Sequence, residues 1–149
     1  MTSDKTTIRG RTRITFRDAM TGEILEQMPW KENLVTDDGE ALFAELMGGL
    51  SADYITYCAV GSDDTAANEA DSSLGAEIGR LPITDISIST STLTFSTFFG
   101  SADCNGAWNE VGLLTGAAGG VLVCRNVLAS EFTKNATKTA TIDYEVEVA

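Results

Sequence analysis

The residues best placed to do chemistry in this chain are four arginines near its start. They share one parity within residues 6–17 and are Arg9, Arg11, Arg13 and Arg17. The apolar residues of that segment have the opposite parity, and a period of two places the arginines on one face of a β-strand. Guanidinium groups bind carboxylates in bidentate pairs. The row therefore predicts docking on an acidic partner or on another copy of the chain.

Other interpretations of the arginine row stay open. The charges could be solvated on an exposed strand face, or they could protect an unpaired edge strand. Nucleic-acid binding ranks below these, because residues 1–17 carry a net charge of +4 while residues 18–149 carry −16. At −12 overall, the chain repels nucleic acids and anionic membrane surfaces over most of its area. No apolar run approaches the roughly 20 residues that span a bilayer, and no secretory signal is expected.

Catalysis is not expected. The chain has no histidine, which removes nucleophilic centres of the Ser–His and Cys–His kinds. Its 22 acidic residues include no pair that is marked as a glycosidase dyad. No Walker or dinucleotide-binding motif occurs. We therefore expect neither an enzyme nor a cofactor.

The polar loop at residues 61–72 is a candidate cation site. It offers five oxygen-bearing side chains, those of Asp63, Asp64, Asn68, Glu69 and Asp71. Their spacing departs from the EF-hand pattern, so a solvated acidic loop is favoured and no metal is predicted.

The three cysteines are widely spaced, at Cys58, Cys104 and Cys124. Without histidine or a CxxC motif they do not form a zinc site. We expect reduced, partly buried thiols. One disulfide with a spare cysteine is the alternative.

Short alternating segments joined by Gly, Asp, Asn and Ser must position these residues. Strands are predicted at residues 6–17, 23–28, 54–60, 83–89, 92–99, 108–114, 121–128 and 139–148. Pro29 is expected to end the second strand. The number of strands and the short turns predict one mainly β domain, an antiparallel β-sandwich of jelly-roll or immunoglobulin-like type. Residues 1–28 would form an N-terminal arm or hairpin, and residues 74–78 a short helical turn.

One short α-helix is predicted near residues 38–47. Asp37 caps it in a capping-box pattern with Glu40, and Gly48 and Gly49 end it. Its apolar stripe consists of Leu42, Phe43, Leu46 and Met47.

Three charged residues are embedded among apolar neighbours later in the chain. We expect Glu110 to pair inside the fold with Arg80 or Arg125. Such pairs are poor guides to function, because burying charges is costly.

A succession of turns, charges and strands carries a family resemblance. Its segments are residues 33–39, 57–61, 74–80, 109–114, 121–125 and 138–144. This succession, over roughly residues 30–149, resembles small virion structural proteins of tailed bacteriophages. The resemblance has no catalytic signature, and it implies a phage particle without a position on it. The arginine hairpin at residues 6–28 falls outside it.

The resemblance implies a capsid decoration (cement) protein that binds the outer shell and stabilises it. Its partners would be the major capsid protein and other copies of itself, in a dimer or trimer, within a virion assembled in the host cytoplasm. A tail, baseplate or fibre-base adaptor is the alternative. A carbohydrate-binding module that contacts the host comes third. It needs exposed aromatic side chains, for which Trp30, Trp108 and Tyr54 are the candidates.

Overall fold

The computed structural model describes residues 7–148, which form nine strands and one helix. The strands are β1 (Ile8–Asp18), β2 (Ile24–Val35), β3 (Tyr57–Gly61), β4 (Glu77–Pro82), β5 (Asp85–Ser89), β6 (Thr92–Phe99), β7 (Gly106–Leu114), β8 (Leu122–Lys134) and β9 (Lys138–Val148). The helix is α1 (Asp37–Met47). All strand pairs are antiparallel. The predicted class, mainly β and antiparallel with one short helix, is confirmed.

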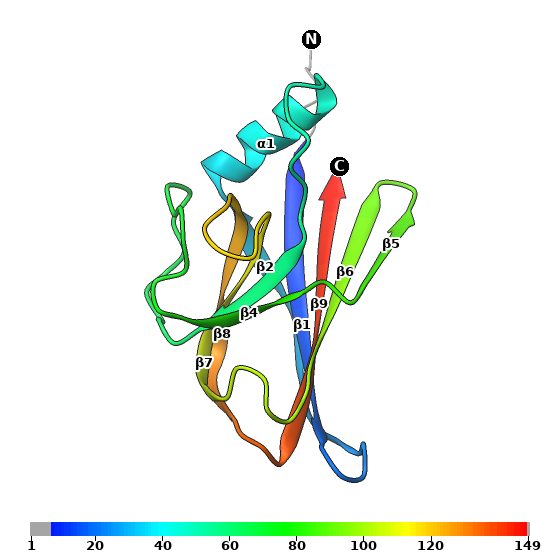
Figure 1. Ribbon diagram of the computed structural model, residues 1–149, viewed down its shortest axis with the longest axis vertical. Helices are drawn as coiled ribbons and strands as arrows, with labels where there is room; N and C mark the ends of the chain where they lie inside the picture. Colours follow the sequence, from blue (N-terminus) through cyan, green and yellow to red (C-terminus); the bar gives the residue numbers. More distant parts are fainter. Residues whose placement is uncertain (1–6, 149) are drawn as a thin grey trace.

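The strands form a single curled sheet in the order β4-β3-β7-β8-β2-β1-β9-β6-β5. Its two halves meet at β2 and β8, which pair only through Leu34↔Arg125 and Val35↔Cys124. Figure 1 shows the halves facing each other and diverging toward the end that carries α1. The strand pairing thus gives one half-barrel, and a sandwich of two separate sheets is not confirmed. The two halves form one sheet rather than two because the long strand β2 pairs with β1 on one side and with β8 on the other.

The hydrophobic core fills the space between the two halves. The Trp108 ring of β7 lies 5.7 Å from the Phe16 ring of β1 and 5.2 Å from the Phe99 ring of β6, measured between centroids. Tilted and edge-on pairs of this kind suit the aromatic quadrupole. The Trp108 indole N–H donates to the Cys104 carbonyl oxygen, so the buried ring leaves no polar atom unpaired.

Strand β2 continues through Pro29, so the prediction that Pro29 ends it is wrong. The register against β1 shifts between Thr12↔Lys31 and Ile14↔Met28, which leaves one extra residue on β2. A proline has no N–H for a ladder, and such a bulge is where a strand tolerates one. The β1–β2 turn lies between the two segments predicted as strands, and Gly22 in it has a φ of +75°.

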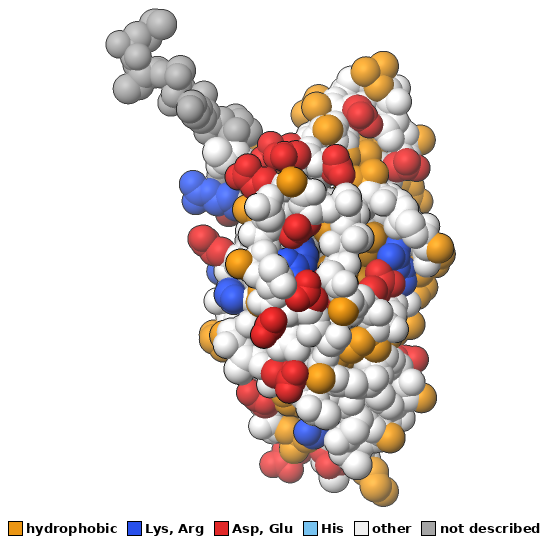
Figure 2. Space-filling model, turned by 90° about the vertical axis from the view of Figure 1, so that its left-hand side faces the viewer, with side chains coloured by type: hydrophobic (Ala, Val, Ile, Leu, Met, Phe, Trp, Pro, Cys, Tyr) orange, Lys and Arg blue, Asp and Glu red, His pale blue; other side chains and the backbone are white. Residues whose placement is uncertain are grey.

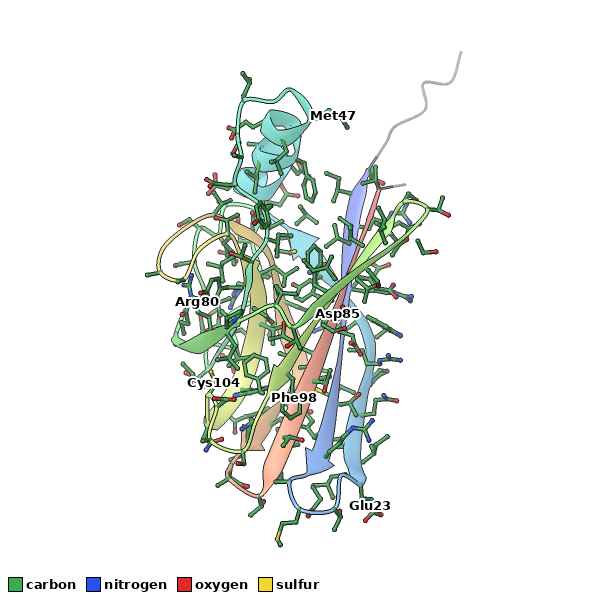
Figure 3. All side chains as sticks on the ribbon, turned by 45° about the vertical axis from the view of Figure 1, so that its right-hand side comes forward. Glu23, Met47, Arg80, Asp85, Phe98 and Cys104 are labelled. Carbon is green, nitrogen blue, oxygen red and sulfur yellow. The ribbon has the colours of Figure 1, made fainter. Side chains whose placement is uncertain are left out.

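Helix α1 begins at Asp37, the residue predicted to be its cap, so the cap lies one residue earlier than expected. Thr36 is the N-cap, and its hydroxyl accepts from the Gly39 N–H. The predicted end at Gly48 and Gly49 is confirmed, with Gly49 at a φ of +70°. Met47 is 91% exposed, so it is not part of the apolar stripe as predicted. Met47 points away from the sheet (Figure 3), so it does not pack with the other residues of the stripe.

The second half of the chain follows the prediction with three corrections. Residues 77–82 form strand β4, where a helical turn at 74–78 was expected. Strand β8 runs to Lys134, beyond the predicted end at residue 128, because residues 132–134 pair with β7. The alternation of residues 139–148 predicts that Val148 faces the core with the other apolar residues of β9, but Val148 is 42% exposed and only the others are buried. The β5–β6 hairpin turns at Thr90 and Ser91 as predicted.

Candidate functional site

The predicted arginines lie on the outer face of β1, in the interior of the sheet. Strand β1 pairs with β2 on one side and β9 on the other, so it is not the edge strand considered above. The hairpin at residues 8–35 is part of the sheet, and the beginning of the predicted arm, with Lys5, lies outside the described residues. Three acids on β9 stand opposite arginines, in the pairs Arg9↔Glu147, Arg11↔Glu145 and Arg13↔Asp143.

Two of the arginines are already engaged. The Arg11 Nε lies 2.6 Å from Glu145 Oε2, and the Arg13 Nη2 lies 3.1 Å from Asp143 Oδ2. Both guanidinium groups also lie over the Trp30 ring of β2, at 4.5 and 4.7 Å from its centroid. Cation–π contacts of this geometry add to the ion pairs. We call this surface, formed by the arginines of β1, the acids of β9 and Trp30, the arginine face.

The other two arginines have no carboxylate within ion-pair distance among residues 7–148. The Arg17 Nη1 donates to the Gly22 carbonyl oxygen and so braces the β1–β2 turn. Arg9 lines a shallow hollow with Glu32 and Glu147. All four arginines therefore lie on one face of the sheet, as predicted. Within residues 7–148, only Arg9 and Arg17 of the four lack an ion pair with a carboxylate.

The acids of the arginine face were not predicted, although the sequence contains a signal for them. Asp143, Glu145 and Glu147 alternate with apolar residues along β9, which marks them as outward-facing. Their pairing with β1 could not be inferred, because some 130 residues separate the two strands.

A buried ion pair links β7 and β8. Glu110 is 0% exposed and Arg125 is 3% exposed, and the Arg125 Nε lies 3.0 Å from Glu110 Oε1. The Glu110 carboxylate also accepts from three loop N–H groups, those of Asp63, Gly75 and Ala76. The predicted internal pair is confirmed with Arg125. Arg80 pairs with Glu77 instead.

Two carboxylates of the acidic loop, those of Asp63 and Asp71, lie close to Arg125. Asp71 Oδ2 lies 3.3 Å and Asp63 Oδ2 lies 3.6 Å from guanidinium nitrogens of Arg125. The Thr65 backbone N–H and hydroxyl also bind Asp63, and these bonds lower the pKa of that carboxyl. Within residues 7–148, no three His, Cys, Asp or Glu side chains form a group that could hold a metal ion. The cation that these acids meet is the guanidinium of Arg125.

The three cysteines, all within the described residues, are free. Burial raises the pKa of Cys58 and of Cys124 to about 12. Burial also raises the pKa of Cys104, which is only half-buried. A thiol that stays protonated is a poor nucleophile, so the cysteines serve as core side chains.

Of the three candidate aromatics for sugar binding, one remains exposed. Trp108 is fully buried, and the Trp30 ring is covered by Arg11 and Arg13. Tyr54 is 64% exposed. Among these three positions, Tyr54 alone therefore presents a mostly exposed aromatic side chain.

An apolar groove lies beneath α1, at the end of the molecule where the sheet halves diverge. It has a volume of about 220 Å³, and its lining is almost wholly apolar. The helix contributes Leu42, Phe43 and Leu46, and the β5–β6 hairpin contributes Ile86, Leu93 and Phe95. Figure 1 shows the helix and this hairpin at the same end. This groove could not be predicted from the sequence, because it depends on which strands the helix covers.

No family model, curated protein or solved structure matches this chain. Within residues 7–148, no helix has the length and apolar character needed to cross a membrane.

Proposed function

We propose that this protein is a structural component of a tailed-bacteriophage virion, without enzymatic activity, and that it is a capsid decoration protein. The observation that carries the proposal is the internal pairing of its charged groups. Glu110, Arg125, Arg11 and Arg13 all have partners inside the chain, so they are not poised for chemistry. The exposed features that remain, the arginine face and the apolar groove, suit contact with other proteins.

The fold supports a contact role in a second way. Its two sheet halves pack face to face around one aromatic core, an arrangement that gives a rigid body with long polar outer faces. We propose that the half-barrel is a variant of the jelly-roll or immunoglobulin-like sandwich in which β2 bridges the two layers. Rigid sheets of this kind need no reaction centre in order to bridge neighbouring subunits.

The arginine face is the proposed docking surface for the major capsid protein. Arg9 and Arg17 supply positive charge that no carboxylate of residues 7–148 pairs with, and Arg11 and Arg13 supply groups that can exchange partners. Acidic side chains outnumber basic ones on the side of the molecule that Figure 2 shows, in contrast to the row of arginines on the arginine face. A protein that binds only the assembled shell stabilises it by mass action. The site of action is therefore the virion, assembled in the host cytoplasm.

The tail or baseplate adaptor is the second candidate, and it would use the same surfaces with far fewer copies. A quantitative mass-spectrometric copy number in purified particles separates the two. A ratio to the major capsid protein near parity, or a simple large fraction of it, supports decoration. A ratio that matches tail components rejects decoration, and absence from particles rejects the virion role altogether.

A further inference from the structure

Among residues 7–148, strand β5 has a partner strand on only one side of its backbone. It is the last strand of the sheet order and pairs only with β6, from Asp85↔Ser96 to Ser89↔Thr92. Every residue of β5 is exposed. In an antiparallel ladder, alternate residues turn their N–H and C=O groups to opposite sides. Half of the β5 backbone groups therefore face an open edge.

The opposite edge of the sheet is protected and this one is not. Strand β4 carries Glu77 and Arg80, ends at Pro82, and has an irregular register against β3. Charge, proline and irregular register are the devices by which edge strands avoid other chains. Residues 85–89 contain no basic residue and no proline, and their register against β6 is unbroken.

The sequence of β5 is complementary to itself around Ser87. When two copies run antiparallel with Ser87 opposite Ser87, Ile86 of each copy lies opposite Ile88 of the other. These apolar cross-strand pairs share one face of the sheet and stabilise the pairing. Asp85 lies opposite Ser89, so no like charges oppose each other. The two Asp85 side chains are then about 13 Å apart along the ribbon, beyond the screening length of about 10 Å at 0.1 M salt.

The hairpin geometry agrees with that register. Thr90 and Ser91 form a two-residue turn, and a β-turn closes through its first and fourth residues, here Ser89 and Thr92. Alternation then directs the backbone groups of the odd-numbered residues to β6 and those of Ile86 and Ile88 to the open edge. The two isoleucines, which oppose each other in the self-complementary register, are thus the residues with backbone groups free to bond.

The same pairing brings an apolar side chain of the second copy to the border of the apolar groove. Ile86 lines the groove and is 49% exposed, while Ile88 is 71% exposed. In the register around Ser87, the Ile88 of a second copy stands beside Ile86 at the border of the groove. Apolar burial then adds to the new backbone hydrogen bonds.

We infer that two copies of this chain associate through antiparallel pairing of their β5 strands around Ser87. The product is a twofold dimer in which one sheet continues through both copies. This inference specifies the oligomer of the proposed function, and it rests on that proposal only for the expectation of self-association.

Sedimentation velocity of the full chain over a range of concentrations tests the dimer. We expect a dimer whose dissociation constant falls as salt rises, because each copy carries a net charge of −12. Ile88→Lys should weaken it by at least roughly tenfold, because twofold symmetry places two lysines at the interface. Met20→Lys is the matched control, since Met20 is exposed in the β1–β2 turn at the other end of the molecule (Figure 1). Circular dichroism checks that both variants fold.

Disulfide trapping tests the register. Directly opposed residues of a pair without mutual hydrogen bonds have Cα atoms about 4.5 Å apart, within the range that a disulfide spans. Ser87→Cys should therefore form a cross-linked dimer under mild oxidation. Ser89→Cys should not, because its copies are about 13 Å apart in this register.

Three results overturn the inference. They are a wild-type chain that is monomeric at all concentrations, a dimer that survives Ile88→Lys, and cross-linking that is equal for Ser87→Cys and Ser89→Cys. None of them bears on the copy number in particles, so failure of the dimer and failure of the virion role are distinguished.

Discussion

The carboxylate of Glu110 binds the guanidinium of Arg125 at 3.0 Å, and together they fasten the long acidic loop to the sheet. Glu110 accepts the N–H groups of Gly75 and Ala76 at one end of the loop, and Arg125 reaches Asp71 within it. Each member of the ion pair also binds the loop, Glu110 through backbone N–H groups and Arg125 through the Asp71 carboxylate. The loop is therefore held by buried charge together with the apolar packing of Leu74.

Glu110→Gln should destabilise the protein strongly. It leaves the Arg125 guanidinium buried without its nearest counter-charge, which costs about 3–5 kcal/mol. For a chain of this size, the melting temperature should fall by about 10 °C. Glu23→Gln, at an exposed acid, is the control and should leave the thermal melt unchanged. An unchanged melt for Glu110→Gln would show that the pair contributes no stability.

Two of the three thiols should resist modification in the folded protein. Cys58 and Cys124 are buried, and their pKa is raised to about 12, so they hold almost no thiolate at neutral pH. A chromogenic disulfide reagent at pH 8 should react slowly, and only with Cys104. Three equivalents should react at once in denaturant. Fast reaction of more than one thiol in the native protein would contradict the buried positions.

Gly39→Ala should destabilise the protein although alanine favours helices. A Cβ at Gly39 would meet the Val123 backbone of β8, with its Cα at 2.9 Å. We expect a loss of about 1–3 kcal/mol from overpacking, measured by urea unfolding. Gly48→Ala is the matched control, because its nearest neighbour would be the Ala44 oxygen at 3.6 Å. Equal effects of the two substitutions would refute the close packing of α1 on β8.

Charge reversal at Arg11 and Arg13 tests the docking surface. Arg11→Glu combined with Arg13→Glu should abolish co-sedimentation with purified shells. Any residual binding should depend less on salt, because two cationic contacts are lost.

The same reversal places like charges beside Glu145 and Asp143, so its effect on the fold needs a control. Adding Glu145→Gln and Asp143→Asn removes that repulsion. This fourfold variant should melt within a few degrees of the wild type and still fail to bind. Binding at the wild-type level would reject the arginine face as the docking surface.

The β1–β2 turn should contribute a pH dependence at acid pH. The Asp18 carboxylate accepts from the backbone N–H groups of Thr21 and Met20, and these bonds lower its pKa. A lowered folded pKa gives stability that is present above the unfolded value of about 3.9 and is lost as the pH falls through the folded value. Asp18→Asn should therefore flatten the thermal stability profile below pH 4. An identical acid slope in the two proteins would contradict this assignment.

Local patterns in the sequence predicted most of the strands and their faces. The alternation of residues 8–17 and 139–146 placed the arginines outside and Tyr144 inside, as the structure has them. The prediction that Pro29 ends its strand was wrong, because the bulge that accommodates Pro29 depends on pairing with β1, which the local sequence does not reveal. Thr36 was missed as the cap because its hydroxyl also bonds to β8, a contact that exists only in the folded protein.

Strand order was beyond prediction for a physical reason. Only Ile83 and Thr84 separate β4 from β5, yet these strands form the two opposite edges of the sheet. Neighbours in sequence usually pair in space, and here the chain crosses the half-barrel instead. The candidate site was therefore predicted only in part. The sequence indicated the arginines, but the acids that face them and the apolar groove depend on the strand order.

The place of β9 in the sheet also determines when the protein can fold. As the last described strand, it lies between β1 and β6 and pairs with both along most of its length. A ribosome releases β9 only after all the other strands have emerged. Until then β1 and β6 each lack a neighbour, and their exposed edges are open to wrong partners. The sheet therefore cannot be completed until residues 138–148 have left the ribosome, and nascent chains that stall before residue 138 should be captured by chaperones.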